Sequence, residues 1–176
     1  MGRRVPLDMA ALVFILASDG NNAALASEVE NRAIEMGHSV TTVHLNAYDF
    51  PIYTVATEQE IEELDGLASL VESLSKGEAW MVFAPEYNGS FPPVLNNAVA
   101  WLSRTGDDFR RLFRDRKVAL ATHSGGGGAH VIMAMRMQFS YLGSNVIGRS
   151  LTVNKKKAAN VDTIDAILNS LTGGIQ

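Results

Sequence analysis

The feature that most constrains this chain is a regular alternation of short strand-like runs with longer segments of helical spacing. Ala11–Ala17 is a continuous apolar run, which is typical of a strand covered on both faces. Four more strands are expected, at Ser39–Leu45, Ala79–Ala84, Val118–Thr122 and Asn145–Val153. Because strands and helices alternate five times, the sequence predicts an α/β fold with a doubly wound, five-stranded parallel sheet. Right-handed crossovers favour the strand order 2-1-3-4-5, with a ligand crevice at the carboxyl ends of strands 1 and 3.

The segments between these strands carry the helical patterns. A helix is expected from Ala23 to the cap at Gly37, because apolar residues recur there at three- or four-residue spacing. The other helices are expected at Glu58–Leu74, Pro93–Ser103, Ala129–Leu142 and Val161–Leu171. Acidic residues in the second of these five helices indicate a solvated face rather than a metal site. With no internal repeat and no long linker, residues 1–176 are expected to form one domain.

Composition excludes several classes of function. Of the 176 residues, 47% are hydrophobic and 19% are charged, and the net charge is −4. Neither disorder nor nonspecific nucleic-acid binding is expected from these values. The chain has no cysteine, which removes disulfides, thiolate metal sites and cysteine nucleophiles, and suits a reducing cytoplasm. No apolar run reaches the ~18 residues of a membrane-spanning helix, so we expect a cytoplasmic protein with no membrane or nucleic-acid partner.

The amino-terminal segment admits two interpretations. Gly2-Arg3-Arg4, followed by the apolar run from Met9 to Ala17, resembles a signal peptide. Asp8 interrupts that pattern, and a buried strand explains the same apolar run. The buried strand is therefore the favoured interpretation.

Three loops of unusual composition follow the expected strands 1, 3 and 4, so they are expected to converge at the crevice. In the first loop, Ser18, Asn21 and Asn22 offer hydroxyl and amide donors where a helix begins. Free backbone N–H groups at a helix start bind phosphate. Plain N-capping explains the same residues equally well. Asp19 opposes phosphate binding unless its carboxylate points away.

The second and third loops suit a flat polar ligand. Prolines stiffen the loop from Pro85 to Pro92, which then presents main-chain groups with little ordering cost. Glu86 would suit a general acid, but the sequence offers it no partner. The third loop, His123–Gly128, has four glycines that allow a close approach to a ligand, yet it matches neither a P-loop nor a dinucleotide fingerprint. His123 fits acid–base chemistry, pairing with a ligand carbonyl, or a structural role.

The stretch from Phe83 to Arg104, FAPEYNGSFPPVLNNAVAWLSR, resembles the signature of the NADPH-dependent FMN reductase family. These are flavodoxin-like flavin, quinone, azo-dye and chromate reductases. The order of elements agrees over nearly the whole chain, including the loop Asp49–Tyr53 after the second strand. The resemblance therefore implies a flavodoxin-like fold, FMN in the crevice and NAD(P)H as co-substrate.

The resemblance also implies which residues bind the cofactor. The segment that borders the isoalloxazine ring and ribityl chain corresponds to Pro85–Asn88, and the loop at the polar end of the flavin corresponds to Ser124 and Gly125. With the first loop and His123, the expected cofactor-binding residues are Ser18, Asn21, Asn22, Pro85, Glu86, Tyr87, Asn88, His123, Ser124 and Gly125. No catalytic side chain and no metal is expected, because the cofactor carries the chemistry. A homodimer or homotetramer with the flavin near an interface is expected.

The first loop departs from the family pattern. The family usually has an arginine and a second serine there, and this loop lacks both and is shorter. Asn96 also stands where the family usually has a lysine. A charge-assisted phosphate contact contributes ~1.5–3 kcal/mol, so this departure predicts weaker FMN binding. Arg104 and the cluster Arg110–Arg116 are the sequence's candidates for the missing charge.

Three functions follow as hypotheses. The first is an NAD(P)H-dependent FMN oxidoreductase that reduces a flavin, a quinone or a similar acceptor. The second is a flavodoxin-like module with weak or lost FMN binding and no reductase activity. The third is a hydrolase that uses Ser124 with His123, although no carboxylate is evident to orient the histidine. Association is expected to bury the helix around Val94, Val99 and Trp101, unless these form core, or the loop around Tyr48 and Tyr53.

Overall fold

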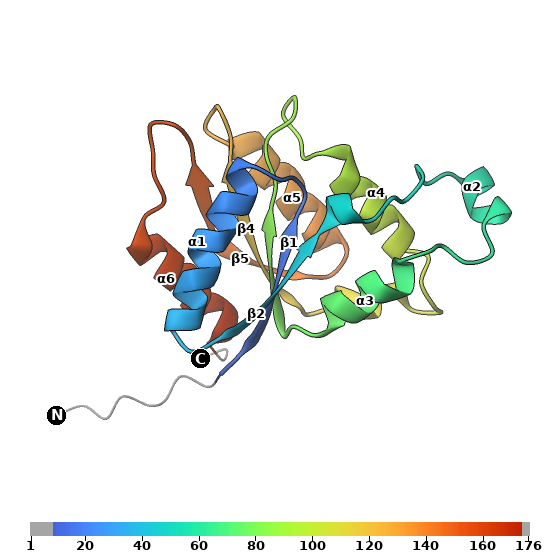
Figure 1. The fold of residues 1–176 in the computed structure, drawn as a ribbon, viewed down its shortest axis with the longest axis horizontal. Coiled ribbons are helices and arrows are strands. Elements are labelled where there is room, and N and C mark those ends of the chain that lie inside the picture. Colours follow the sequence, from blue (N-terminus) through green and yellow to red (C-terminus); the bar gives the residue numbers. More distant parts are fainter. Residues whose placement is uncertain (1–8, 174–176) are drawn as a thin grey trace.

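A five-stranded sheet runs through the middle of the molecule (Figure 1). The structure, a computed structural model, describes residues 9–173. Every strand pair is parallel, and the order β2-β1-β3-β4-β5 confirms the predicted 2-1-3-4-5. The strands are β1 (Ala11–Leu16), β2 (Ser39–His44), β3 (Ala79–Phe83), β4 (Lys117–His123) and β5 (Asn145–Val153).

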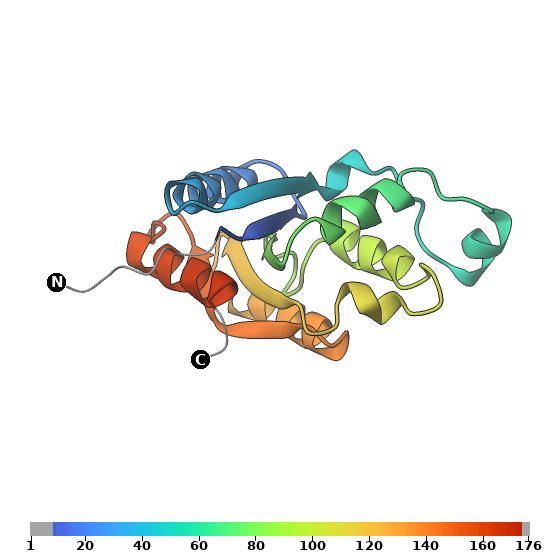
Figure 2. The ribbon, with the colours of Figure 1, turned by 90° about the horizontal axis from the view of Figure 1, so that it is seen from below.

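Helices cover both faces of this sheet (Figure 2). One face packs against α1 (Asn21–Glu35) and α6 (Val161–Thr172), and the other against α3 (Leu67–Ser75), α4 (Pro93–Leu102) and α5 (Ala129–Tyr141). All five residues of β3 are buried, and alternate side chains belong to the two cores. Trp80 and Val82 pack on the α3–α4–α5 side, while Met81 and Phe83 pack on the α1–α6 side. Two-sided burial explains why β1 and β3 read as continuous apolar runs.

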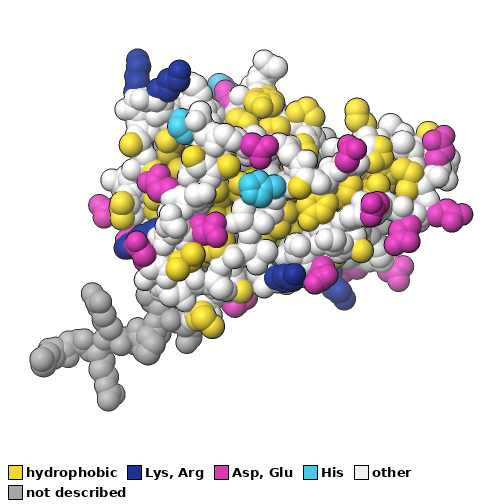
Figure 3. All heavy atoms as spheres, in the orientation of Figure 1, with side chains coloured by type: hydrophobic (Ala, Val, Ile, Leu, Met, Phe, Trp, Pro, Cys, Tyr) yellow, Lys and Arg dark blue, Asp and Glu magenta, His cyan; other side chains and the backbone are white. Residues whose placement is uncertain are grey.

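The helix expected over Glu58–Leu74 is wrong, because two helices occupy this part of the chain. α2 (Val55–Glu60) begins earlier, since the Thr54 and Thr57 side chains form a reciprocal capping box. The second helix, α3, begins after Gly66, whose φ of 78° favours glycine. Between them the chain exposes acidic residues, which gather at one end of the molecule (Figure 3). The prediction of a solvated acidic face agrees with this exposure.

The inner side of α4 anchors the loop that follows β2. Trp101 is 3% exposed, and its Nε1 donates to the Pro51 carbonyl at 2.8 Å. The Asn97 side chain accepts from the Tyr53 N–H at 2.8 Å and donates to the Pro51 carbonyl at 3.0 Å. The Tyr53 ring meets Trp101 edge to face. Val99 and Trp101 are buried within a single copy of the chain, which agrees with the alternative left open by the sequence, that these residues form core.

The amino-terminal apolar run forms β1, as the strand interpretation expected. The segment Gly2-Arg3-Arg4, with its two basic residues, lies outside the described residues. Of the helices formed by residues 9–173, none has the length and apolar character needed to cross a membrane. Two 3-10 turns, η1 (Leu45–Ala47) and η2 (Phe109–Leu112), complete the elements.

Candidate active site

The three unusual loops leave the sheet at its carboxyl edge, as predicted. Hydrogen bonds between neighbouring strands continue past the strand ends. The Ala17 N–H donates to the Phe83 carbonyl at 2.9 Å, and the Ala84 N–H donates to the Ala121 carbonyl at 3.1 Å. The Ser124 N–H likewise donates to the Val153 carbonyl at 3.1 Å. The loops after β1, β3 and β4 therefore begin side by side at one edge.

The β1–α1 loop presents polar groups that lack partners. α1 begins after Gly20, no side chain caps it, and no acidic residue lies in its first turn. The first backbone N–H groups of such a helix point outward and carry the positive end of the helix dipole. The Ser18 Oγ is buried and has no hydrogen-bond partner within residues 9–173. A ligand with anionic oxygens would satisfy both.

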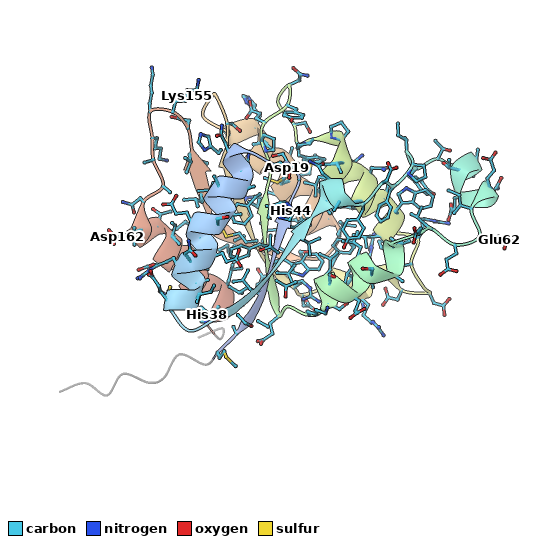
Figure 4. The ribbon with its side chains drawn as sticks, viewed as in Figure 1. Asp19, His38, His44, Glu62, Lys155 and Asp162 are labelled. Atoms are coloured by element: carbon cyan, nitrogen blue, oxygen red, sulfur yellow. The ribbon has the colours of Figure 1, made fainter. Side chains whose placement is uncertain are left out.

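Asp19 points away from this helix start, toward the end of β2 (Figure 4). Its Oδ2 accepts from the Asn46 amide at 3.0 Å, and its Oδ1 lies 3.5 Å from the His44 Nδ1. The hydrogen bond from Asn46 lowers the pKa of the Asp19 carboxyl, and His44 lowers it further. The Asp19 carboxylate is thus held by Asn46 and His44, away from the start of α1, so it opposes phosphate binding there less than the sequence indicates.

Asn22 has a different role from the one expected of its amide group. Asn22 is 2% exposed, and both polar atoms of its side chain form hydrogen bonds. The Nδ2 donates to the His123 carbonyl at 3.1 Å, and the Oδ1 accepts from the His123 N–H at 2.9 Å. Only the backbone N–H of Asn22 remains for a ligand. Asn21, the preceding residue, is exposed.

The loops after β3 and β4 satisfy each other. The Glu86 N–H donates to the buried Ser124 Oγ at 2.8 Å, and that oxygen lies 2.6 Å from the Thr122 Oγ1. The Glu86 Oε2 lies 3.4 Å from the Val131 N–H, in the first turn of α5, and the Oε1 lies 3.6 Å from the His130 Nδ1. Because no residue of α5 caps its own start, the Glu86 carboxylate supplies the negative charge there. This is the partner that the sequence did not reveal.

A tight turn follows Glu86. Tyr87 and Ser90 exchange backbone hydrogen bonds at 2.8 and 3.0 Å, and Asn88 and Gly89 between them have φ values of 51° and 79°. Asn-Gly is the preferred pair for such a two-residue turn, and it is a signal that the sequence carries. Tyr87 is 51% exposed at the turn. The expected residues from Pro85 to Asn88 therefore form a short, stiff projection beside the β4–α5 loop.

The glycine loop lies open on one side. An added Cβ at Gly125, Gly126 or Gly127 would meet nothing within 4 Å, so the backbone there is accessible. At Gly128, an added Cβ would lie 2.4 Å from the Thr122 Cγ2, and φ is 70°. The open glycines permit close approach of a ligand, while Gly128 is required for the turn into α5.

The hydrolase hypothesis finds no support in this geometry. The Ser124 Oγ is buried between the Thr122 hydroxyl and the Glu86 N–H. The His123 side chain instead lines a hollow of about 340 Å³ between the start of α1 and the chain after β5. Ser124 and His123 are neighbours in sequence but have different contacts, and they form no nucleophile–base pair.

The arginines expected to supply the missing charge lie elsewhere. Arg104 pairs with Glu58, with 2.6 Å between the Arg104 Nε and the Glu58 Oε1. Arg116 stacks on Trp80 and donates to the Gly77 carbonyl, which precedes β3 at the amino edge of the sheet. Within one copy of the chain, these side chains do not serve the carboxyl edge. Lys155, which lines the same hollow as Asn21 and His123, is a nearer cation that sequence reasoning missed (Figure 4).

Comparisons with known proteins agree with this geometry. The family model for NADPH-dependent FMN reductase matches residues 9–158. A quinone reductase of Escherichia coli K12 is 29% identical over 133 residues, which covers 71% of this chain and 69% of that protein. The match of the family model spans all five strands and the loops after β1, β3 and β4.

Solved structures share the fold. FerB of Paracoccus denitrificans, a flavoenzyme NAD(P)H:acceptor oxidoreductase, superposes with a TM-score of 0.75 at 16% identity, covering 93% of this chain and 97% of that one. The apo form of the NADH:FMN oxidoreductase EmoB gives a TM-score of 0.69 at 16% identity, covering 94% and 92%. The fold is therefore flavodoxin-like, as the resemblance implied. The match of the family model over most of the chain shows that this protein belongs to the NADPH-dependent FMN reductase family, oxidoreductases that use FMN and NAD(P)H.

Proposed function

We propose that this protein is an NAD(P)H-dependent FMN reductase whose FMN binds at the carboxyl edge and whose electrons pass to a quinone, a flavin or a similar acceptor. The observation that carries the proposal is the contrast at that edge between an unsatisfied β1–α1 loop and two mutually bonded loops beside it. An anionic group would complete the hydrogen bonding of the β1–α1 loop. The mutually bonded loops after β3 and β4, here called the wall, form a rigid surface beside it. FMN has an anionic phosphate at one end and a flat polar ring at the other.

The phosphate end would be held by the first turn of α1. The Ser18 hydroxyl, buried and without a partner among the described residues, donates to a phosphate oxygen. The backbone N–H groups of Asn21, Asn22 and Ala23 donate to the others, because no side chain occupies them as a cap. Lys155, which lines the same hollow as Asn21, supplies a positive charge.

The ring end would lie along the Pro85–Asn88 segment and the β4–α5 loop. Prolines and the turn at Asn88 hold the first of these, and the Glu86–Ser124 bond fixes it to the second. Gly125 then offers main-chain groups to the ring, while His123 and Ser124 hold the loop in place. The N–H and carbonyl of His123 are paired with the Asn22 side chain, and the hydroxyl and N–H of Ser124 are paired with Glu86 and Val153. Tyr87, half exposed, covers the ring from the base of the turn.

When bound, FMN supplies the redox chemistry by accepting a hydride from NAD(P)H and returning electrons to an acceptor. The residues of this chain position the reactants and exclude water, and we assign none of them as a catalytic acid or base. A quinone is the favoured acceptor because the relative of 29% identity is a quinone reductase. A cytoplasmic location stays a prediction that rests on the absence of cysteine.

The direct test is a reductase assay on purified protein with FMN. The proposal predicts flavin-dependent oxidation of NADPH or NADH that accelerates when a quinone such as menadione is added. Binding of FMN without oxidation of either nicotinamide would instead favour the alternative of a flavodoxin-like module without reductase activity. Failure to bind FMN at all would overturn both.

We also propose that a second copy packs on the surface formed by α4 and α5. Met133, Met137 and Tyr141 lie along the outer side of α5 and are 64%, 73% and 75% exposed. α4 has no charged residue, and Arg136, the one Lys or Arg of α5, donates to carbonyls of β5. In a two-fold interface each patch meets its own copy, so a mainly apolar surface favours self-association. The Arg110 guanidinium, 5.5 Å from the centre of the Tyr141 ring, is a positive charge beside this surface. This surface replaces the Val99–Trp101 face expected from the sequence.

Sedimentation velocity tests this surface. Met137→Glu should convert a dimer or tetramer to smaller species, because it places like charges opposite each other. Ile34→Glu is the matched control, since Ile34 is an exposed apolar residue (55%) on α1, and it should leave the assembly unchanged. Wild-type protein that sediments only as a monomer at micromolar concentration would refute the proposal.

A further inference from the structure

Asn22 is a buried polar residue that the proposed chemistry does not use directly. We infer that Asn22 is a positioning residue, which holds the first turn of α1 against the end of β4 and so sets where the phosphate end of the cofactor binds. The inference rests on the proposed function, because it takes the start of α1 as the phosphate site. It assigns to Asn22 an effect on binding that acts through the backbone rather than through its own side chain.

The bonds of Asn22 resemble one hydrogen-bonded pair of an antiparallel ladder. Its carboxamide donates to the carbonyl and accepts from the N–H of one residue, His123, which is 101 residues away in sequence. A buried carboxamide with both groups satisfied by main chain has little freedom to rotate. Removing it would leave the N–H and the carbonyl of His123 without these partners, and an unpaired backbone group is costly where water is scarce.

The tether continues beyond His123. The next residue, Ser124, accepts the Glu86 N–H, and Glu86 contacts the first turn of α5. A chain of side-chain to main-chain bonds therefore runs from α1 through the end of β4 to the β3–α4 loop. Because the two proposed ends of the cofactor site lie at opposite ends of this chain, Asn22 controls the distance between them.

The short β1–α1 loop makes this control necessary. A longer loop with an arginine would bring its own charge to the phosphate, and small errors in the helix position would matter less. Here, besides the Ser18 hydroxyl, the proposed donors are backbone N–H groups of α1, which cannot reach out as a long side chain does. They can reach the phosphate only if the whole first turn of α1 is correctly positioned, and Asn22 lies in that turn. A shift of the helix start would weaken all the backbone donors of α1 together.

If Asn22 only stabilises the fold, its loss should affect FMN and riboflavin binding alike. If Asn22 positions the phosphate site, its loss should affect FMN binding more. FMN and riboflavin share the ring and ribityl chain, and they differ only in the phosphate. The ratio of the riboflavin Kd to the FMN Kd therefore measures the phosphate contribution alone. General loosening of the fold weakens both ligands alike and leaves this ratio unchanged.

The experiment titrates flavin-free full-length protein with FMN and with riboflavin, following flavin fluorescence. We expect Asn22→Ala to lower the ratio of the two Kd values by about tenfold, the loss of roughly one charge-assisted contact. Asn160→Ala is the matched control, because the Asn160 Oδ1 caps α6 by accepting from the Thr163 N–H at 2.9 Å. It removes an asparagine bond and lowers stability, yet it should leave the ratio as in wild type.

The outcomes separate the inference from the function. A wild-type preference for FMN that persists unchanged in Asn22→Ala overturns the inference alone. A wild type that binds neither flavin overturns the proposed function and the inference with it. If Asn22→Ala does not fold, Asn22→Ser replaces it, and the same ratio decides by the same criterion.

Discussion

The β1–α1 loop and the two loops after β3 and β4 share one edge of the sheet but differ in how their polar groups are satisfied. Glu86, Ser124 and the start of α5 bond to one another. Ser18 and the first turn of α1 are left open, while Asp19 and Asn22 bond outward to β2 and β4. Loops that satisfy themselves form a fixed wall, and a loop that does not is where a ligand completes the hydrogen bonding.

The largest effect on the free energy of unfolding is expected at Gly128, where the β4–α5 loop packs against Thr122. Gly128→Ala should lower the free energy of unfolding by about 2–4 kcal/mol, because its Cβ would lie 2.4 Å from the Thr122 Cγ2 at a φ that favours glycine. Chemical denaturation measures the change. Gly126→Ala is the control, since an added Cβ there meets nothing within 4 Å, and it should shift stability by less than about 0.5 kcal/mol. Equal losses in both variants would contradict the packing argument.

A smaller effect is expected from the carboxylate that joins the wall to α5. Glu86→Ala should destabilise the protein by about 1–2 kcal/mol, because the start of α5 loses its negative charge and its capping contact. Glu86→Gln keeps an acceptor without the charge, so it should lose less than Glu86→Ala. Thermal unfolding in low and high salt tells the two apart. A larger loss in the Gln variant would show that the side chain does not act as a cap.

Removing the open hydroxyl should separate binding from stability. Ser18→Ala should weaken FMN about tenfold, yet leave riboflavin binding unchanged, because only a phosphate needs this donor. Unfolding stability should stay the same or rise slightly, since the Oγ is buried without a partner among the described residues. Calorimetric titration and denaturation of the same variant give both numbers. A loss of stability with unchanged FMN affinity would mean that Ser18 belongs to the wall.

The smallest effect is expected at Asp19. Asp19→Asn should tighten FMN by less than about threefold, because the carboxylate is exposed and already paired with Asn46 and His44. The pKa of Asp19 is lowered mainly by the Asn46 hydrogen bond, so its stabilising contribution is complete above about pH 4 and is lost as the pH falls further. Acid unfolding of the variant should therefore lack this component. A tenfold gain in affinity would place the carboxylate against the phosphate.

The sequence predicted the parts of this molecule whose signals are local. Apolar runs gave the strands, and Pro93 marked the start of α4. The break between α2 and α3 was missed because Asp65-Gly66 lies within a long run of good helix formers, although Gly66 was a sign of it. The resemblance in the stretch from Phe83 to Arg104 led to the right family.

The bonds that organise the site were beyond sequence reasoning. Asn22 and His123 are 101 residues apart, and Glu86 and Val131 are 45 apart. No periodicity links such pairs, because they meet only once the sheet is assembled. The same holds for Arg104 and Arg116, whose charges looked available in the sequence and prove to be engaged at other places in the fold.

The most direct test of the central claim uses backbone amide resonances of the flavin-free protein during titration. We predict that FMN, but not riboflavin, shifts the amides of Asn21, Asn22 and Ala23 strongly, while both ligands shift those of Glu86 to Asn88 and Gly125 to Gly127. That pattern would put the phosphate at the start of α1 and the ring along the wall. Phosphate-dependent shifts confined to the separate hollow that is lined by Asp107, Asp108, Phe109, Arg111, Leu112 and Arg116 would contradict the account.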